Sequence, residues 1–461
     1  MRPPQRSVAL RDRAVAALAR LLARSFFRTV ETSGPAPAPG PVILAASHLN
    51  GFVDPILLVA ELGALPRFLA KSTIWKVVAL RPVLSFVRMI PVYRHQDTDG
   101  PIDNSKTFAA AVGALRGGNL VAIFPEGTTH DDPTLRPLRT GVARIALQAA
   151  AEGVEGVRIV PVGVTYEDKV AVRGRALLTF GAPIDVTPAA DPADDRAEVR
   201  ALTDRVREAL RTLTPDFRST EDAYALGLAA RTMLRSTMPA REVTMARTAA
   251  VARRIADGDA SSAYEVVSTV ARYEMLLGLV GLDDEDLQPG AGLQRIVRRV
   301  ALLAALIVVM APFAVAGVFA NLVPVLLVLA IGLAVKAPVS KGTARFLVAV
   351  VAFPLMWGLV AVLDAGSGWA GHLARQVTYP LDGALDRLFD GRGGLGASLS
   401  VFVAIPVLGA IALVLAERFR TLLHDLEVWR TLLDRRGQLD AVRARRATVV
   451  GVTSAASEAG R

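Results

Sequence analysis

The feature that most constrains this chain of 461 residues is an uncharged stretch, residues 300–335. A helix needs about 20 residues to cross a bilayer, so the stretch is too long for one upright span and slightly short for two. Asn321 and Pro324 interrupt its middle. Basic residues flank it on both sides: Arg295, Arg298 and Arg299 before it, and Lys336, Lys341 and Arg345 after it. Because basic flanks tend to stay in the cytoplasm, the pattern predicts a hairpin or a re-entrant segment with both ends on the cytoplasmic face.

Two further apolar stretches, 346–363 and 397–416, extend the predicted membrane part over residues 296–420. The segment between them lacks the basic excess of the other flanks and suits the far side of the membrane. An arginine-rich tail, residues 421–461, then returns to the cytoplasm and is expected to be helical or disordered. Buried helices of a soluble domain are the alternative, but the length of the uncharged stretch argues against them. We therefore predict an integral membrane protein.

The overall charge of the chain limits the classes of partner that it is expected to bind. A formal net charge of +10 fits nucleic acid, an anionic membrane surface or an acidic substrate. The sequence has neither zinc-finger spacing nor an RNA-binding aromatic pattern, so we expect membrane lipid and no nucleic acid as a partner. The chain has no cysteine, which excludes disulfides, thiolate zinc sites and a cysteine nucleophile.

The N-terminal segment, residues 1–32, predicts a basic amphipathic helix over 13–28. Arginines interrupt every apolar run, which argues against a secretory signal peptide. One stripe at helical spacing is basic and another is apolar: Arg13, Arg20, Arg24 and Arg28 form the first, and Val15, Leu18, Leu22 and Phe26 the second. Such a helix either lies among lipid headgroups or packs as a solvated helix on the next domain, and the sequence leaves both alternatives open.

Residues 33–215 predict an α/β domain, a mixed sheet flanked by helices. After a Pro/Gly/Ala-rich linker that ends near residue 41, β-type runs alternate with helical patterns. The expected strands are 42–46, 67–70, 90–93, 119–124, 158–166 and 177–181, and the expected helices are 55–62, 72–88, 105–116, 141–152 and 193–213. Residues 216–295 carry helical patterns only, so we expect a helical connecting region before the membrane part.

His48 stands out among the five histidines because it follows the apolar run 42–46 directly. The end of a strand in an α/β sheet is where ligands tend to bind. Asp54 follows six residues later, so a curled loop would bring its carboxylate to the imidazole. A histidine with a carboxylate on its second nitrogen suits general-base chemistry near neutral pH. Asp54 followed by Pro55 is also a typical helix start, so helix capping is the competing explanation.

Other candidate groups follow neighbouring strands. Glu126 and Gly127 lie in the run Ile123-Phe-Pro-Glu-Gly-Thr-Thr129, where Gly127 permits a tight turn, although a plain turn would also explain this run. Arg139 opens a predicted helix whose free backbone N–H groups suit a phosphate. Arg94 and Lys71 are further cations at strand ends. Together with the His48 pair, these cations predict an anion site.

These residues resemble the motifs of the glycerolipid acyltransferase family, which includes glycerol-3-phosphate and 1-acylglycerol-3-phosphate acyltransferases. His48–Asp54 is similar to the first motif, Ile90–Arg94 to the second, Phe124–Gly127 to the third and Ile159–Val162 to the fourth. Five residues separate His48 from Asp54, where commoner members have four. This spacing, with Val339–Thr343 and Phe353–Trp357, is similar to a subgroup of fungal glycerol-3-phosphate and dihydroxyacetone-phosphate acyltransferases and bacterial relatives.

The resemblance implies that the chain is an O-acyltransferase of phospholipid biosynthesis. His48 and Asp54 would be the catalytic pair, and Arg94, Glu126 and Gly127 would bind a glycerol-phosphate-type acceptor. Lys71 and Arg139 are weaker candidates for the same site. Acyl-CoA or acyl-carrier protein would be the acyl donor, and no cofactor or metal is expected. The alternatives are a lysophospholipid-remodelling acyltransferase and a non-catalytic membrane scaffold or transporter.

Overall fold

A computed structural model describes most of the chain. It covers residues 10–76, 78, 81–94, 103–169, 171, 173–188, 195–214, 216–287, 293–336, 338–367 and 393–460. Contacts divide the chain into two units, which we describe separately. The first unit comprises Met1–Val267, Ala337–Thr343 and Thr453–Arg461, and the second comprises Ser268–Lys336 and Ala344–Val452. The segment predicted to lie on the far side of the membrane falls between the stretches 346–363 and 397–416. Its acidic residues, apart from Asp364, lie outside the described residues.

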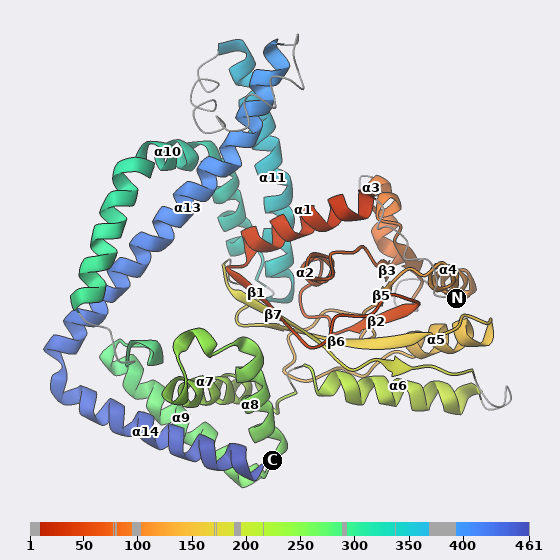
Figure 1. The fold of residues 1–461 in the computed structure, drawn as a ribbon, viewed down its shortest axis with the longest axis horizontal. Coiled ribbons are helices and arrows are strands. Elements are labelled where there is room, and N and C mark those ends of the chain that lie inside the picture. The colour runs from red at the N-terminus through yellow and green to blue at the C-terminus, as the bar shows by residue number, and fades with distance from the viewer. Residues whose placement is uncertain are drawn as a thin grey trace. The chain divides into compact units, whose positions relative to one another are not determined.

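The first unit is built on an eight-stranded sheet (Figure 1). The strands are β1 (Thr29–Ser33), β2 (Val42–Ala46), β3 (Arg67–Lys71), β4 (Ile90–Val92), β5 (Val121–Ile123), β6 (Arg158–Tyr166), β7 (Arg175–Phe180) and β8 (Ile184–Asp185). Their order is β1-β7-β6-β2-β5-β3-β4, with β8 also paired to β6. Pairing is parallel except where β7 and β8 meet β6. Strand β2 is a continuous apolar run, buried throughout, as expected of a central parallel strand.

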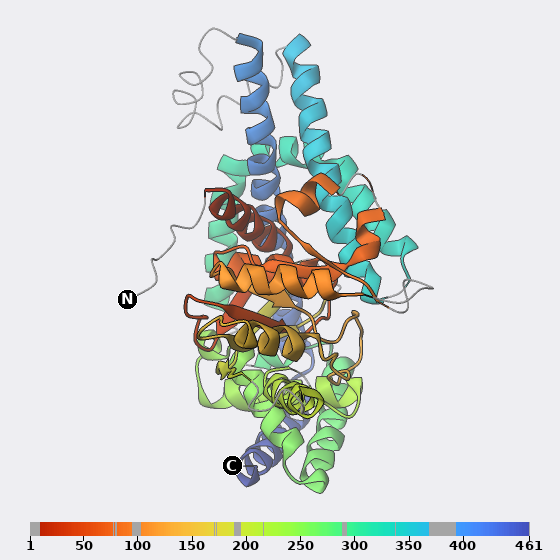
Figure 2. The same ribbon diagram turned by 90° about the vertical axis from the view of Figure 1, so that its right-hand side faces the viewer.

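Helices cover both faces of this sheet. On one face, α1 (Leu10–Phe26) packs on α2 (Val53–Leu62). The other face carries α4 (Ser105–Arg116), α5 (Gly141–Ala151) and α6 (Asp195–Arg211), as Figures 1 and 2 show. The main apolar core lies between these three helices and the sheet. The predicted α/β fold with a mixed sheet flanked by helices is confirmed.

Some elements differ from the predicted ones. The short strands β1 and β8 were not expected, since neither has enough apolar residues to stand out from its surroundings. The helix expected over 72–88 is instead a 3₁₀ turn, η1 (Ser72–Lys76), and a short helix, α3 (Arg81–Phe86). Pro82 restricts the residue before it and lacks an N–H group, so it suits a new helix start better than a helix interior.

Helix α1 packs on the sheet domain through small side chains, which corrects the predicted apolar stripe. Ala16, Ala19 and Ala23 are buried together with Phe26, whereas Leu18 is exposed. Alanines allow two helix axes to approach closely, so the buried alanine stripe packs on the domain, while Leu18 and Leu21 are exposed and Leu22 is half-buried. The structure thus contains the flank-packing arrangement, and a role of the outer face at lipid headgroups stays a prediction.

The remaining elements among the described residues are helical. They are α7 (Thr220–Thr237), η5 (Ala240–Glu242), α8 (Met245–Asp257), α9 (Ala260–Val280), η6 (Asp284–Leu287), α10 (Leu293–Ala334), α11 (Pro338–Ser367), α13 (Gly393–Asp434) and α14 (Arg436–Ala459). Three of the described helices are long and apolar enough to cross a membrane: Val297–Ala334, Lys341–Leu363 and Val401–Asp434. The C-terminal tail, predicted to be helical or disordered, is helical.

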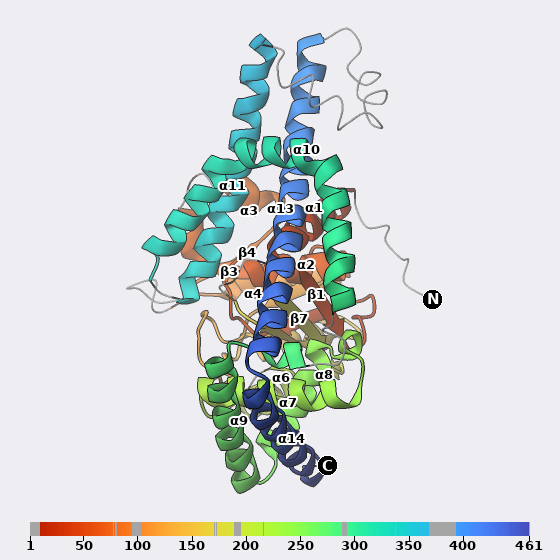
Figure 3. The ribbon, with the colours of Figure 1, turned by 90° about the vertical axis from the view of Figure 1, so that its left-hand side faces the viewer.

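Helix α10 carries the uncharged stretch, and the hairpin or re-entrant path of this stretch through a membrane stays a prediction. It is one continuous helix with Pro312 and Pro324 inside it. Prolines cannot donate to the preceding turn, so they bend a helix. Figures 1 and 3 show α10 rising, bending over and descending again. Asn321 stabilises the middle of this helix: its Nδ2 donates to the Gly317 carbonyl (2.8 Å), and its Oδ1 accepts from Trp357 Nε1 of α11 (2.9 Å).

Candidate active site

His48 lies at the carboxyl end of the central strand β2, where the strand's neighbours fix the backbone. The Ser47 N–H donates to the Val162 carbonyl (3.0 Å), and the Ser47 hydroxyl accepts from the Val164 N–H (2.9 Å). The loop then curls, as expected, so that His48 Nδ1 lies 2.9 Å from Asp54 Oδ2. Asp54 is fully buried. The structure therefore brings the two predicted catalytic side chains into direct contact.

The contacts of Asp54 correct the competing explanation of this residue as a helix cap. Helix α2 begins at Val53, and the residue at its N-cap position is Phe52, without a capping side-chain hydrogen bond. Asp54 lies inside the first turn. Its Oδ2 accepts from the Asn50 backbone N–H (2.8 Å), which precedes the helix, as well as from His48. The carboxylate therefore organises the loop before the helix rather than the free N–H groups of the helix.

Tyr166, at the end of β6, is a third member of this group that the sequence did not single out. Its hydroxyl donates to Asp54 Oδ1 in a short hydrogen bond. Its ring stacks on Phe27 at 5.7 Å between centroids. Desolvation of the hydroxyl and the adjacent Asp54 charge raise the pKa of Tyr166 well above its usual value, so the hydroxyl stays protonated as a donor. Both oxygens of Asp54 therefore accept hydrogen bonds.

This arrangement determines the tautomer of His48. A carboxylate can only accept, so Nδ1 of His48 carries the proton and Nε2 has a free lone pair. None of the described residues hydrogen-bonds to Nε2. The imidazole stacks on Phe124 at 4.1 Å between centroids and is 17% exposed. His48 can thus act as a proton acceptor toward the adjoining cavity.

Glu126 has a different place from the one predicted. It is buried at 4% exposure and is not among the residues that line the cavity, so its predicted contact with substrate stays a prediction. Its Oε1 accepts from the backbone N–H of His48 (2.9 Å), and its Oε2 accepts from the backbone N–H of Arg136 (3.2 Å) and pairs closely with His130. A buried carboxylate needs such partners. Glu126 therefore holds the backbone of His48.

His130 is a second buried group that the sequence left without a role. Its Nδ1 accepts from the Asp132 backbone N–H (3.2 Å), so its proton lies on Nε2, where it is donated to Glu126. The backbone carbonyl of His130 accepts from Lys169 Nζ (3.1 Å), and Lys169 also pairs with Asp131. Burial lowers the pKa of Lys169. This network fixes the loop that follows Gly127.

Gly127 and Arg94 meet in the structure. Gly127 has a positive φ of 72°, which fits the predicted tight turn. Its carbonyl accepts from Arg94 Nη1 at 2.6 Å, so the guanidinium is held at the edge of the turn. The side chain of Arg139 also lies close, since a Cβ on Gly127 would be 3.5 Å from it.

A cavity of about 1220 Å³ adjoins His48. Its cationic lining residues are Lys71, Arg94, Arg139 and Arg144. Three of these were predicted, and the structure brings them to one cavity. Arg144 was not predicted because it lies within the helical pattern of α5; its guanidinium lies 5.7 Å from the Phe108 ring centroid. The backbone at the start of α5 also lines the cavity, which adds helix N-terminal N–H groups to the cations.

The other lining side chains are mostly apolar. They include Phe68, Leu69, Ile74, Met89, Phe108 and Phe124. The rings of Phe68 and Phe124 are stacked at 6.3 Å, next to the stack of Phe124 on His48. The cavity therefore combines a general-base candidate, an anion-binding surface and an apolar surface, which are the three properties that acyl transfer to a phosphorylated alcohol requires.

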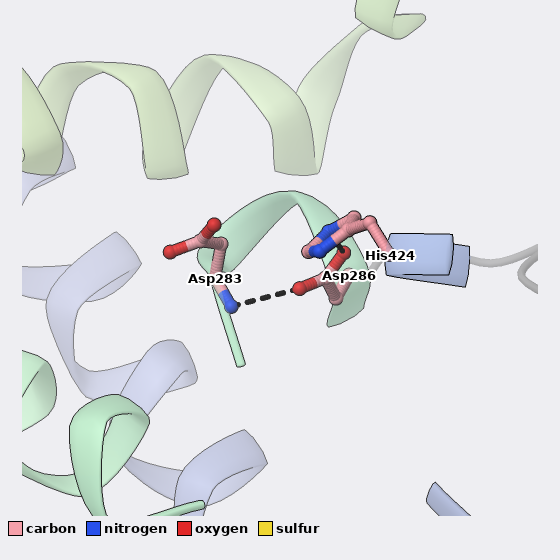
Figure 4. A group of neighbouring side chains, drawn as sticks. All are labelled: Asp283, Asp286 and His424. Atoms are coloured by element: carbon pink, nitrogen blue, oxygen red, sulfur yellow. Dashed lines mark hydrogen bonds and ion pairs between the residues drawn. The ribbon is translucent and has the colours of Figure 1, made fainter. Parts of the chain in front are cut away.

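A separate group of possible metal ligands lies in the second unit. Figure 4 shows Asp283, Asp286 and His424, whose ligand atoms lie within 4.8 Å of one another. The contacts of Asp286 explain the group without an ion, because Oδ1 lies 3.0 Å from His424 Nε2 and Oδ2 accepts from the Asp283 N–H (2.8 Å). Asp283 and His424 are exposed. We assign no metal to it.

Comparison with known proteins adds to this geometry. Residues 28–165 match the Acyltransferase family profile, a range that contains His48, Asp54, Arg94 and Gly127. These residues form an acyltransferase-family domain. The predicted resemblance to glycerolipid acyltransferases is thereby confirmed, whereas membership of the subgroup with the longer spacing stays a prediction.

Two curated relatives of this acyltransferase-family domain come from Saccharomyces cerevisiae. Glycerol-3-phosphate O-acyltransferase 2 is 44% identical over 86 residues, which are 18% of this chain and 12% of that protein. Glycerol-3-phosphate O-acyltransferase 1 is 33% identical over 119 residues, 24% of this chain and 16% of that protein. The chain thus spans less than a fifth of the length of these relatives.

A solved structure is also similar. The 1-acyl-sn-glycerophosphate acyltransferase of Thermotoga maritima is 19% identical, with a TM-score of 0.32, over 43% of this chain and 78% of that one.

Proposed function

We propose that this protein transfers an acyl group from a thioester donor to a hydroxyl of glycerol-3-phosphate or 1-acylglycerol-3-phosphate. The observation that carries the proposal is the contact between His48 Nδ1 and the buried carboxylate of Asp54 (2.9 Å), on the wall of a cavity lined by cations. The acyltransferase-family match over residues 28–165 and the similarity to glycerol-3-phosphate O-acyltransferases support the same reaction.

In the proposed reaction, the phosphate of the acceptor binds the cations Arg94, Arg139 and Lys71. Nε2 of His48 takes the proton of the acceptor hydroxyl while its oxygen attacks the thioester carbonyl carbon. The C–O bond forms, the C–S bond breaks, and the leaving thiolate takes the proton from His48. Asp54 stabilises the imidazolium that exists between these two transfers. Backbone N–H groups at the cavity wall would stabilise the developing oxyanion.

The proposed reaction needs only the side chains of this chain and an acyl donor, acyl-CoA or acyl-carrier protein. Apolar cavity residues next to His48 would contact the acyl chain. The apolar helices support a membrane protein. We propose that the catalytic domain works on the cytoplasmic face, because both flanks of residues 300–335 are basic. Membrane lipid would then be the medium that receives the product.

The proposal is tested by an acceptor panel with one labelled acyl-CoA and one labelled acyl-carrier protein. The panel contains glycerol-3-phosphate, dihydroxyacetone phosphate, lysophosphatidate and a lysophospholipid, each with the purified full chain and with the His48→Ala variant. We expect transfer to a phosphate monoester, and a kcat/KM about 10²- to 10⁴-fold lower in the variant. Transfer to the lysophospholipid alone would replace the proposal with phospholipid remodelling. Transfer to none would favour a scaffold.

A further inference from the structure

The N-terminal end of α11 packs against the loop that carries His48. In the sequence, Lys341–Thr343 lies between the apolar stretches 300–335 and 346–363, yet Ala337–Thr343 belongs by its contacts to the sheet-containing unit. The Thr343 hydroxyl donates to Asn50 Oδ1 (3.2 Å), and Asn50 Nδ2 donates to the Lys169 carbonyl (3.1 Å). Thr343 also lines the cavity next to His48 and Gly51. A segment remote in sequence therefore completes the wall beside the candidate base.

Two glycines allow this contact. A Cβ on Gly342 would lie 2.7 Å from the Lys169 carbonyl oxygen and 3.0 Å from atoms of the Asn50 side chain. A Cβ on Gly51 would lie 3.3 Å from Thr343 Cβ and nearer still to its hydroxyl, and Gly51 has a positive φ of 35°. A side chain at Gly342 would meet the backbone carbonyl of Lys169 and force the two segments apart, whereas a Cβ at Gly51 would meet only the side chain of Thr343. At Gly342 the two backbones thus approach at a distance that only glycine permits.

The contact leads directly to the candidate catalytic pair. Asn50 is 1% exposed, and its backbone N–H donates to Asp54 Oδ2 (2.8 Å), the same oxygen that contacts His48 Nδ1. Hydrogen bonds therefore link Thr343 to Asn50, Asn50 to Asp54, and Asp54 to His48. A displacement of Thr343 would change the position of Asn50 and with it the geometry of the carboxylate.

We propose that Lys341–Thr343 is a positioning element of the active site, which holds the 48–54 loop in the conformation that orients His48. The catalytic consequence rests on the proposed function; the docking does not. The helix that starts here continues through Lys341–Leu363, which is long and apolar enough to cross a membrane. The loop that carries His48 thereby contacts the start of a helix that is long and apolar enough to cross a bilayer. This assigns a role to the Val339–Thr343 motif.

Docking is tested first, without reference to activity. The chain has no cysteine, so the double variant Gly51→Cys/Thr343→Cys offers a single possible disulfide. The Cβ positions of residues 51 and 343 are 3.3 Å apart. The Cβ atoms of a disulfide are about 3.5–4.5 Å apart, so a small shift accommodates the bond. We expect mild oxidation of the full membrane-embedded chain to form it, as detected by peptide mass spectrometry. The control pair is Gly51→Cys/Gly358→Cys, because no atom of another described segment lies within 4 Å of a Cβ at Gly358.

Positioning is tested by substitutions near the N-terminal end of α11. We expect Gly342→Ala to lower kcat at least tenfold with KM changed less than twofold, while Gly358→Ala on the same helix keeps the wild-type kcat. Thr343→Val, which removes only the hydroxyl, should lower kcat several-fold, and Thr343→Ser should restore it. Wild-type kcat in Gly342→Ala, or equal losses in both glycine variants, would overturn the positioning role.

The two tests distinguish a failure of the docking from a failure of the proposed function. No cross-link at 51/343, under conditions in which both single-cysteine variants react with a thiol reagent, would overturn the docking itself. A wild-type chain that cross-links but transfers no acyl group to any acceptor would overturn the proposed function and the catalytic part of this inference, with the docking retained.

Discussion

The two walls of the cavity hold their charged groups in different ways. On the His48 wall, Asp54 is fully buried, and its oxygens accept from His48, the Asn50 N–H and the Tyr166 hydroxyl. On the cation wall, which the lining residues Lys71, Arg139 and Arg144 form, the side chains are exposed. One wall is fixed before a substrate arrives, and the other can adjust to the substrate.

This difference predicts how each wall contributes to catalysis. Fixed, desolvated groups stabilise charge that develops only in the transition state, so their loss lowers kcat. Exposed cations interact with a phosphate that carries its charge throughout the reaction, and salt screens them. Their loss should therefore raise the acceptor KM with a smaller effect on kcat. Substitutions on each wall can test whether one wall determines kcat and the other determines the acceptor KM.

The largest effect is expected for Asp54→Asn. The amide is neutral, so it would not stabilise the positive charge that the imidazole gains when His48 takes the proton. We expect kcat to fall about 10²- to 10⁴-fold, the range of general acid–base catalysis, with the acceptor KM nearly unchanged. Steady-state kinetics with varied acceptor measures both. A rise in KM without a loss of kcat would remove Asp54 from the catalytic pair.

A smaller effect on the same wall is expected for Tyr166→Phe. Without the hydroxyl, Asp54 Oδ1 loses its donor, and the less stabilised carboxylate favours the imidazolium form of His48 more strongly. Lys169, whose pKa is influenced by the Asp54 charge, remains as the other charged neighbour. We expect kcat to fall about tenfold, roughly the value of one charge-assisted hydrogen bond. The acid limb of the kcat/KM–pH profile should move to higher pH.

A purely structural role of Tyr166 would give a different result. The loss of packing alone would lower the thermal midpoint and the amount of folded protein without moving the acid limb. The ring that stacks on Phe27 is kept in phenylalanine, so this substitution separates the hydroxyl from the ring.

Sequence patterns predicted the parts of this site that are local. His48 and Asp54 lie six residues apart, after a strand whose apolar run marks it clearly, so one loop can bring them together. The helix over 105–116 was likewise predicted with its observed bounds, since its apolar spacing is regular. Such features depend on residues close in the chain.

The remaining parts depend on contacts between distant segments. Tyr166 reaches Asp54 only because β6 pairs with β2, and Thr343 reaches Asn50 across 293 positions of sequence. No local pattern marks Tyr166, and the Val339–Thr343 motif does not by itself show which segment Thr343 contacts. Glu126 was placed in the substrate site because it follows a strand, whereas burial and the proximity of His130 turn it toward the backbone of His48. Strand ends predict which loops form a site, but not which side of a loop faces the substrate.

The smallest effect is expected on the cation wall, and it tests the other half of the comparison. We expect Arg94→Ala to raise the acceptor KM about tenfold and Arg144→Ala about threefold, with kcat changed less than twofold, because one partly exposed cation–phosphate contact contributes on the order of 1 kcal/mol. Both increases should shrink at high salt. Arg116→Ala is the matched control, since Arg116 pairs with Glu152 and does not line the cavity. If Arg94→Ala lowered kcat as strongly as Asp54→Asn, its bond to the Gly127 carbonyl would matter more than phosphate binding, and the two walls would not differ as described.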